Sequence, residues 1–228
     1  MRPTSFSGRF LVPVLFVAGA LLAACTGSDA DTLSEYPAGA TGARLALIVT
    51  GDDGTTNAIR SLARHLATDG IPSVVLTPSP SLASPSAASA EVERVVRAHL
   101  ARWNRQRLVV IGLARGAGMA PFVANRLTGD LRSRLDAVVM REPRPRVSFR
   151  RRWHSPWRQG PRPTDLPLLP ELERMRGIPL LCLYRVDEHD PFCPSLDATL
   201  ARREVDPTSD DSERAGAVLA QRVIDFAR

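Results

Sequence analysis

A glycine-framed turn at residues 112–118 has the residue types and spacing that come closest to covalent chemistry. It follows the apolar run 108–111 and leads into a helical pattern, so it joins a strand to a helix. In serine hydrolases this kind of turn reads Gly-x-Ser-x-Gly, and its glycines allow a sharp bend that exposes the central hydroxyl. Here Gly112 and Gly116 frame Ala114, which carries neither an oxygen nor a thiol. The sequence therefore predicts such an elbow with a degenerate nucleophile position.

A second turn, Gly51-Asp52-Asp53-Gly54, follows the apolar run 45–49. Its glycines would let backbone N–H groups approach a ligand, and its carboxylates would line a pocket near the elbow. An ordinary Asp-Gly turn explains the same residues, and both interpretations stay open.

The residue after Ala114 is Arg115, which would place a guanidinium at a helix N-terminus. Positive charge is unfavourable there because the helix dipole is positive at that end. We expect Arg115 to favour an anionic ligand at the mouth of the pocket.

One histidine follows a predicted strand and is placed to act as a catalytic base. His189 lies within Asp187-Glu188-His189-Asp190, where Asp187 or Glu188 could serve as the acid that orients it. The same residues suit a solvated loop, and no nucleophile is evident beside them. Of the other histidines, His65 is expected at an exposed helix position, His99 at the boundary of the core and His154 in a loop.

Alternating strand and helix patterns position these turns. Strands separated by amphipathic helices predict an α/β fold with a doubly wound, mostly parallel sheet, which presents functional loops at the carboxyl ends of its strands. The expected strands lie at 45–49, 73–76, 108–111, 135–140 and 179–184. Helical patterns cover 59–66, 91–103, the segment after residue 116, and 215–226, with a Ser/Pro/Ala-rich loop at 78–89.

Four stretches resemble the VirJ/AcvB-type family of bacterial virulence proteins: IGLARGAGMAPFVANRL at 111–127, VTGDDG at 49–54, VSF at 147–149 with Trp153, and PELERMRGIPLLCLYRVDEHDPFCPSL at 170–196. The resemblance spans residues 44–228. It implies an α/β-hydrolase-like domain facing the periplasm. It also implies roles in virulence, in type IV secretion and in the hydrolysis of aminoacyl phospholipids such as lysyl-phosphatidylglycerol.

The chain departs from this family at two catalytic positions. The family carries Ser where this chain has Ala114, and a His in a Gly-Gly-His-His-type stretch before the last helix. Here that stretch reads VDPTSDD at 205–211, and no histidine follows His189. Losing nucleophile and base together would remove the acyl-transfer mechanism.

The first 24 residues read as a lipoprotein signal peptide. A basic start precedes an apolar run that ends in Leu22-Ala23-Ala24-Cys25, which resembles a bacterial lipobox with Cys25 as the lipidation point. A short membrane anchor is the alternative. Residues 25–43 are predicted to be the lipidated cysteine and a flexible tether. This places the domain at 44–228 in the cell envelope, facing the periplasm, with the inner or outer membrane left open.

The two remaining cysteines, Cys182 and Cys193, lie 11 residues apart. Beyond the membrane such a pair favours a disulfide, and two reduced, buried thiols are the alternative. A metal site is not expected, because two cysteines without a nearby histidine do not complete a tetrahedral set. We expect no cofactor.

Residues 141–162 are rich in arginine with interleaved aromatic side chains. Arginine binds phosphate oxygens and tryptophan suits a membrane interface, so a cap or lid that contacts anionic lipid is one interpretation. The residues expected to make this contact are Arg150, Arg151, Arg152 and Trp153. A solvated loop is the other interpretation.

All 30 basic residues of the chain are Arg, and the formal net charge is +6. Coding bias accounts for this better than nucleic-acid binding, and no nucleic-acid module pattern is present. Three functions are therefore carried forward. The first is a catalytically degenerate, lipid-anchored domain with a binding or scaffold role for an anionic phospholipid or an envelope protein. The second is an active esterase, serine-type or atypical, acting on an aminoacyl phospholipid. The third is a module that binds an anionic membrane surface.

Overall fold

The structure of the protein, a computed structural model, describes residues 33–39, 42–77, 79, 82–150, 163–208 and 211–228. At its centre is a seven-stranded sheet in the order β1-β3-β2-β4-β5-β8-β9, and within it only β1 runs antiparallel to its neighbour. This confirms the predicted mostly parallel sheet. The strands are β1 Leu33–Tyr36, β2 Arg44–Val49, β3 Ser73–Leu76, β4 Arg107–Leu113, β5 Leu135–Arg141, β8 Leu180–Tyr184 and β9 Arg202–Val205.

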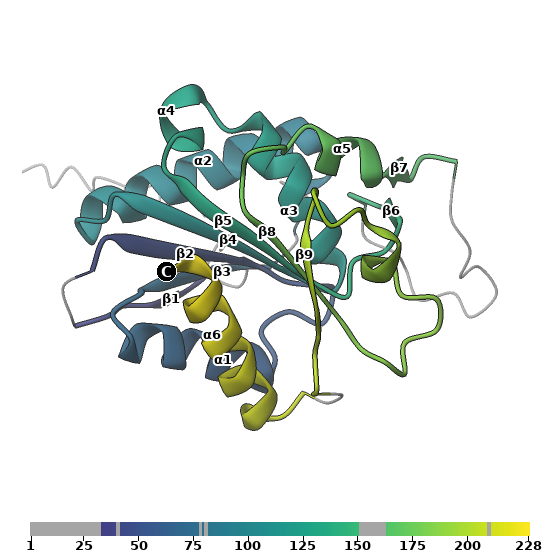
Figure 1. Ribbon diagram of the computed structural model, residues 1–228. Coiled ribbons are helices and arrows are strands. Elements are labelled where there is room, and N and C mark those ends of the chain that lie inside the picture. The colour runs from purple at the N-terminus through teal and green to yellow at the C-terminus, as the bar shows by residue number, and fades with distance from the viewer. Residues whose placement is uncertain (1–32, 40–41, 78, 80–81, 151–162, 209–210) are drawn as a thin grey trace, which may run out of the picture.

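Helices cover both faces of the sheet, with α2 and α3 on one face and α1 and α6 on the other (Figure 1). The long helices are α1 Asn57–Thr68, α2 Pro85–Arg102, α3 Arg115–Arg126 and α6 Glu213–Ala227. Short elements complete the domain: the hairpin β6 Arg146–Val147 with β7 Leu166–Pro167, the helices α4 Gly129–Arg132 and α5 Leu169–Glu173, and the 3₁₀ turn η3 Cys193–Ser195.

The continuous apolar run of β2 is explained by burial on both faces. Leu45, Leu47 and Val49 belong to the core beneath α2 and α3, whereas Ala46 and Ile48 belong to the core beneath α1 and α6. A strand covered on one side alone would need polar residues at alternate positions.

The helix starts follow local capping chemistry. The hydroxyl of Ser84 accepts a hydrogen bond from the backbone N–H of Ala87, and Pro85 occupies the first helical position of α2, where its missing N–H costs nothing. The expectation of a loop up to residue 89 is therefore wrong, because α2 begins within the Ser/Pro/Ala-rich stretch.

The predicted tether also needs correction. Leu33–Tyr36 forms β1, which pairs with β3, and Leu33 packs against the core. Sequence periodicity gave no signal for so short a polar strand, since its place depends on the neighbour with which it pairs. The signal peptide and Cys25 lie outside the described residues.

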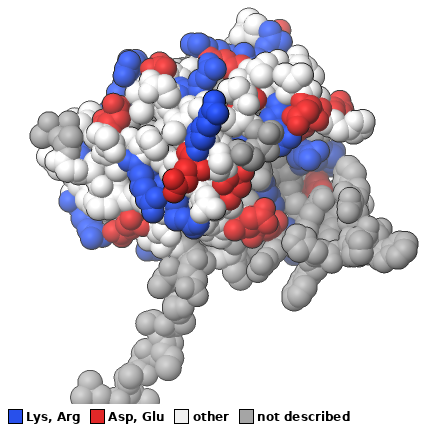
Figure 2. All heavy atoms as spheres, turned by 90° about the horizontal axis from the view of Figure 1, so that it is seen from below, with Lys and Arg blue, Asp and Glu red and all other residues white. Residues whose placement is uncertain are grey.

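Basic and acidic side chains are interspersed on the face seen in Figure 2. Ion pairs such as Arg222 with Glu204, at 2.8 Å, join many of the molecule's arginines to carboxylates. No helix in the described part of the chain is long and apolar enough to span a bilayer.

Candidate functional site

The turn between β4 and α3 has the strained geometry of an elbow. Ala114 adopts φ 52° and ψ −120°, a conformation rarely populated by residues other than glycine, and it is solvent-exposed. The two flanking glycines make this turn possible. A Cβ on Gly112 would lie 2.3 Å from the carbonyl oxygen of Gly116, and one on Gly116 would lie 2.1 Å from the carbonyl oxygen of Val49. The elbow thus has its sharp backbone geometry, although the side chain at its centre is a methyl group.

The loop after β2 meets this elbow, since β2 and β4 are neighbouring parallel strands whose carboxyl ends share one edge of the sheet. A Cβ built on Gly51 would lie 3.0 Å from the Cβ of Ala114. Asp52 is half-buried and Gly54 has a φ of 69°, whereas Asp53 is exposed. The two turns therefore lie against each other and form the candidate site, with the carboxylate of Asp52 half-buried and that of Asp53 exposed.

The guanidinium of Arg115 spans the site. It is 12% exposed, and its Nη2 donates to Oδ1 of Asp52 at 2.6 Å. Its Nη1 donates to the carbonyl oxygens of Ser148 and Phe149, each at 3.4 Å. The ion pair neutralises the charge that would be unfavourable at the N-terminus of α3. An anionic ligand at this point would have to compete with Asp52 for the guanidinium.

A buried ion pair lies beyond the elbow, at the carboxyl ends of β5 and β9. Nε of Arg141 donates to Oδ2 of Asp206 at 2.5 Å, and Asp206 is 4% exposed. Oδ1 of Asp206 accepts from the backbone N–H and the hydroxyl of Thr208, at 2.9 and 2.6 Å. This network was not predicted from the sequence. Its signal was Arg141 at the end of an otherwise apolar run, which needs a counter-charge if it is buried.

The predicted acid positions differ in environment. Asp187 is exposed and bidentate with Arg185, at 2.9 and 2.6 Å, and this pairing lowers the pKa of Asp187. Glu188 is half-buried, and its Oε2 has no hydrogen-bond partner within the described residues. Burial and the nearby Glu142 raise the pKa of Glu188.

The predicted base is not oriented by either acid. His189 is exposed, and its ring makes no hydrogen bond to a described residue. His65 is exposed as expected, with Nδ1 2.8 Å from the carbonyl oxygen of Ser61, and His99 is buried and bonded to Glu35. His154 lies outside the described residues.

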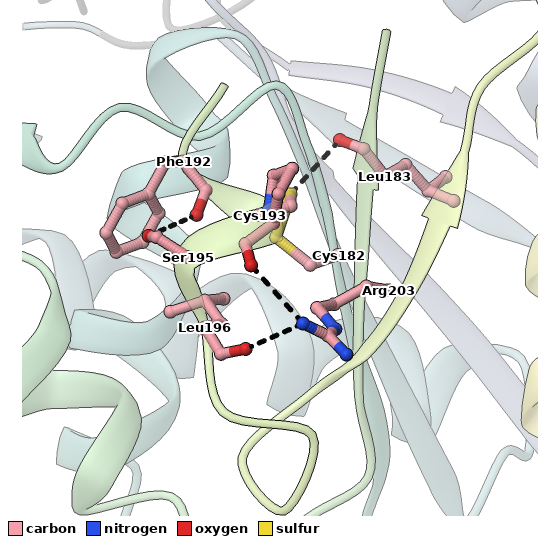
Figure 3. The surroundings of a disulfide bond; sticks show 8 residues. Cys182, Leu183, Phe192, Cys193, Ser195, Leu196 and Arg203 are labelled. Atoms are coloured by element: carbon pink, nitrogen blue, oxygen red, sulfur yellow. Dashed lines mark hydrogen bonds between the residues drawn. A yellow bond between two sulfur atoms is a disulfide. The ribbon is translucent and has the colours of Figure 1, made fainter. Parts of the chain in front are cut away.

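The predicted disulfide is confirmed. Cys182 in β8 and Cys193 in η3 are bonded, with their Cα atoms 5.6 Å apart, and both are buried (Figure 3). Nη1 of Arg203 donates to the carbonyl oxygens of Pro194 and Leu196 beside it. The bond closes the loop that carries Asp187, Glu188 and His189, so it ties this loop to the sheet.

Part of the predicted anionic-contact set is visible. Arg150 is exposed at the end of a described segment, and Arg151, Arg152 and Trp153 lie outside the described residues. Within the described ranges no group of three or more potential ligands gathers where a metal ion could bind.

Comparison with known proteins identifies the family. The pattern of a family described as "Bacterial virulence protein (VirJ)" matches residues 43–228. The chain belongs to the VirJ family. No curated protein matches the sequence.

Solved structures show that this VirJ-family chain has the α/β-hydrolase fold. The structure of Est1E from Butyrivibrio proteoclasticus with ferulic acid has a TM-score of 0.59 at 11% identity, covering 85% of this chain and 93% of that one. The esterase domain of a Rhodothermus marinus protein has a TM-score of 0.53 at 16% identity, covering 86% and 92%. A probable hydrolytic enzyme from Pseudomonas aeruginosa has a TM-score of 0.59 at 13% identity, covering 86% and 89%. At such identities the likeness extends to the fold alone.

Proposed function

We propose that this VirJ-family protein is an envelope-facing lipoprotein whose α/β-hydrolase domain binds its ligand without hydrolysing it, in a role linked to virulence or secretion. The observation that carries this proposal is Ala114 in the strained elbow conformation. The frame that presents a nucleophile is complete, and the side chain it presents has no lone pair with which to attack a carbonyl.

The surroundings of the elbow support the loss of the base as well. In the family resemblance the histidine belongs in the stretch between the last strand and α6. Here Asp206 lies directly after β9 and is committed to Arg141 and Thr208. None of the three described histidines forms a hydrogen bond with a residue of the elbow. General-base catalysis needs such a contact or one bridging water.

The same surroundings suit the binding of an anionic or carbonyl-bearing group. Ala114 supplies no side-chain cap to α3, so the positive end of that helix opens on the site. Arg115 adds a guanidinium whose Nη2 faces the site, where it is bound to Asp52. Asp52 holds this guanidinium in place and would be exchanged for the ligand's own oxygens.

The lipoprotein part of the proposal is supported by the lipobox-like sequence ending at Cys25 and by the disulfide. Disulfides are rare in reducing compartments and persist outside the cytoplasm. This supports a periplasm-facing domain attached to a membrane by Cys25, and both membranes fit it equally well.

One observation favours an alternative, an atypical esterase acting on an aminoacyl phospholipid. Glu188 keeps a buried oxygen without a partner in the described part of the chain, and its pKa is raised. Such a carboxyl can act as a general acid or base. The absence of a nucleophile at Ala114 makes this the second candidate.

Labelling with a fluorophosphonate probe tests the primary proposal. We expect the native protein to remain unlabelled, and the Ala114→Ser variant to remain unlabelled too, because a hydroxyl without a base is a weak nucleophile. A serine esterase of the same fold serves as the positive control. Labelling of the native protein that disappears on denaturation would overturn the loss of the nucleophile. Labelling of Ala114→Ser alone would show that a base survives.

A further inference from the structure

A basic groove lies at the amino ends of β4 and β5, at the edge of the sheet opposite the elbow. It is lined by the last turns of α2, by residues 104–107, and by α4 with the turn that joins it to β5. Its volume is about 710 Å³, within the range of roughly 300–1,000 Å³ that small-molecule sites occupy. The seven residues of β4 separate it from the elbow by about 20 Å, so the groove is a site of its own.

The lining of the groove carries charge of one sign. Four guanidiniums line it: those of Arg97, Arg105, Arg107 and Arg134. No carboxylate is among the described residues of the lining. Asn104 and Gln106 are exposed, and their side-chain amides make no hydrogen bond to a described residue, so they are available as donors to a ligand. An anion that enters the groove therefore meets donors and positive charges.

Two of the four arginines are held in place by carboxylates that lie outside the lining. Nη1 of Arg97 donates to Oδ2 of Asp130 at 2.7 Å. Nε of Arg107 donates to Oδ1 of Asp136 at 2.6 Å, and Nε of Arg44 donates to Oδ2 of the same carboxylate at 3.0 Å. Because Asp136 is shared by two guanidiniums, these ion pairs neutralise only part of the positive charge.

Arg134 gives the groove a guanidinium that no described residue neutralises. The residue is half-buried, and its side chain has no hydrogen-bond or ion-pair partner within the described residues. One further carboxylate, that of Glu93, attracts Arg97. With Arg44 included, five guanidiniums and three carboxylates gather in the described part of this region, which leaves an excess of two positive charges.

The C-terminus of α2 does not offset this charge. The negative end of a helix dipole amounts to about half an elementary charge. Backbone N–H groups of residues 103–105 donate to the last carbonyl oxygens of α2 at 2.8–3.3 Å, so these oxygens are already bonded. The side chain of Arg105 donates to the carbonyl oxygen of Gly42 at 2.7 Å. The guanidiniums therefore dominate the electrostatic potential of the groove.

We propose that this basic groove binds a small soluble ligand that carries two linked phosphate groups. The planar fork of an arginine matches phosphate oxygens in geometry and charge, and hydrogen bonds assisted by charge are stronger than neutral ones. Two linked phosphates match an excess of two positive charges, whereas the single charge of a phosphodiester neutralises half of it. The proposal is independent of the elbow and of the lipid anchor, because no residue of the groove belongs to either.

Calorimetric titration with inorganic pyrophosphate tests the site, on the full-length protein in a non-ionic detergent and a phosphate-free buffer. We expect Arg134→Gln to weaken the binding of pyrophosphate by about tenfold or more, because it removes a charge-assisted contact. Gln106→Glu places a carboxylate at an exposed position of the lining and should weaken binding by a similar factor or more.

Arg214→Gln is the matched control. Arg214 is exposed on α6, which covers the other face of the sheet from α2, and its side chain has no partner among the described residues. Its removal should change the affinity for pyrophosphate by less than about twofold, because salt screens a charge so far from the groove. The melting temperature of each variant without ligand should equal that of the native protein, which shows that the fold is retained.

The source of the phosphate is tested with glycerophosphoglycerol, the singly charged headgroup of phosphatidylglycerol. We expect it to bind the native protein at least about tenfold more weakly than pyrophosphate does. Equal or tighter binding of this headgroup would assign the groove to a lipid and overturn the soluble diphosphate. The proposal also fails if pyrophosphate does not bind the native protein, or if Arg214→Gln weakens binding as much as Arg134→Gln, since the attraction would then come from overall charge.

Discussion

Ala114 adopts a strained backbone conformation that its own methyl side chain does not favour. A residue other than glycine in a sparsely populated region of this kind costs on the order of 1–3 kcal/mol. The surrounding structure imposes the conformation through Gly112 and Gly116, which let α3 approach β2 and β4 closely. The geometry at this residue is that of a sharp strand-to-helix turn that exposes its central side chain.

Replacing Ala114 with Gly should stabilise the protein. The change relieves the strain of the folded state. It also stabilises the unfolded chain by about 0.4–1 kcal/mol, because glycine has more conformational entropy there, so we expect the free energy of unfolding to rise by up to about 2 kcal/mol. Asn104→Gly is the control, because Asn104 has a φ of 50° but belongs to a residue type that tolerates it. Urea unfolding measures both, and a lower midpoint for Ala114→Gly would contradict the strain.

Gly116→Ala should be strongly destabilising, because its Cβ would lie 2.1 Å from the carbonyl oxygen of Val49. We expect a loss of about 1–3 kcal/mol or more, by overpacking against the backbone. Gly129→Ala is the matched change, since nothing lies within 4 Å of a Cβ at that position. Thermal unfolding of the two variants should differ clearly, and equal melting temperatures would refute the close approach at the elbow.

Among the elements, the loop after β8 is tied to the sheet by the disulfide. Reducing the Cys182–Cys193 bond should lower the free energy of unfolding by about 2–3 kcal/mol, as expected for a closed loop of this size. Urea unfolding with and without a reductant measures the loss. The double variant Cys182→Ser with Cys193→Ser is the control. If the reductant lowered the unfolding midpoint of this variant as much as that of the native protein, the loss of stability would have a cause other than the disulfide.

The edge strand β1 is held by charge as well as by backbone pairing. Glu35 accepts a hydrogen bond from His99 at 3.1 Å and pairs with Arg102 at 2.7 Å, and these contacts lower the pKa of Glu35. A carboxyl with a lowered folded-state pKa adds stability above its ordinary value of 4.5 and loses it as the pH falls through the folded value.

Acidification below pH 4.5 should therefore weaken the native protein more steeply than its Glu35→Gln variant. Unfolding curves across this pH range measure the slope. The exposed Glu173→Gln is the control and should leave the slope unchanged. Identical slopes for the native protein and Glu35→Gln would show that β1 is held without this carboxylate.

The amount that could be predicted from sequence also varies by element. After their first residue, an arginine in each case, the strands β2 and β4 have no polar side chain, so their burial on both faces could be predicted from the residues themselves. The strands β1 and β9 are short and polar, and their places depend on partners distant in the chain. The glycines marked the elbow, but the contacts of Arg115 with Asp52 and of Arg141 with Asp206 join residues 63 and 65 positions apart. No local pattern encodes such pairs.

At the scale of the whole molecule, the elbow, the disulfide-closed loop and the start of β1 all lie at the carboxyl edge of one sheet. The parallel strands explain this convergence, because loops after parallel strands meet at one edge. A ligand bound there would meet the guanidinium of Arg115 and the end of α3, with a methyl group where hydrolysis would need a hydroxyl.

The central claim is binding without hydrolysis, and one measurement tests it directly. The purified protein is incubated with vesicles that contain lysyl-phosphatidylglycerol. The lipid bound to the protein and the lysine released into solution are measured in the same sample. We expect lipid to be retained while lysine release stays at the level of protein-free vesicles. Catalytic release of lysine, many equivalents per protein molecule, would contradict the account.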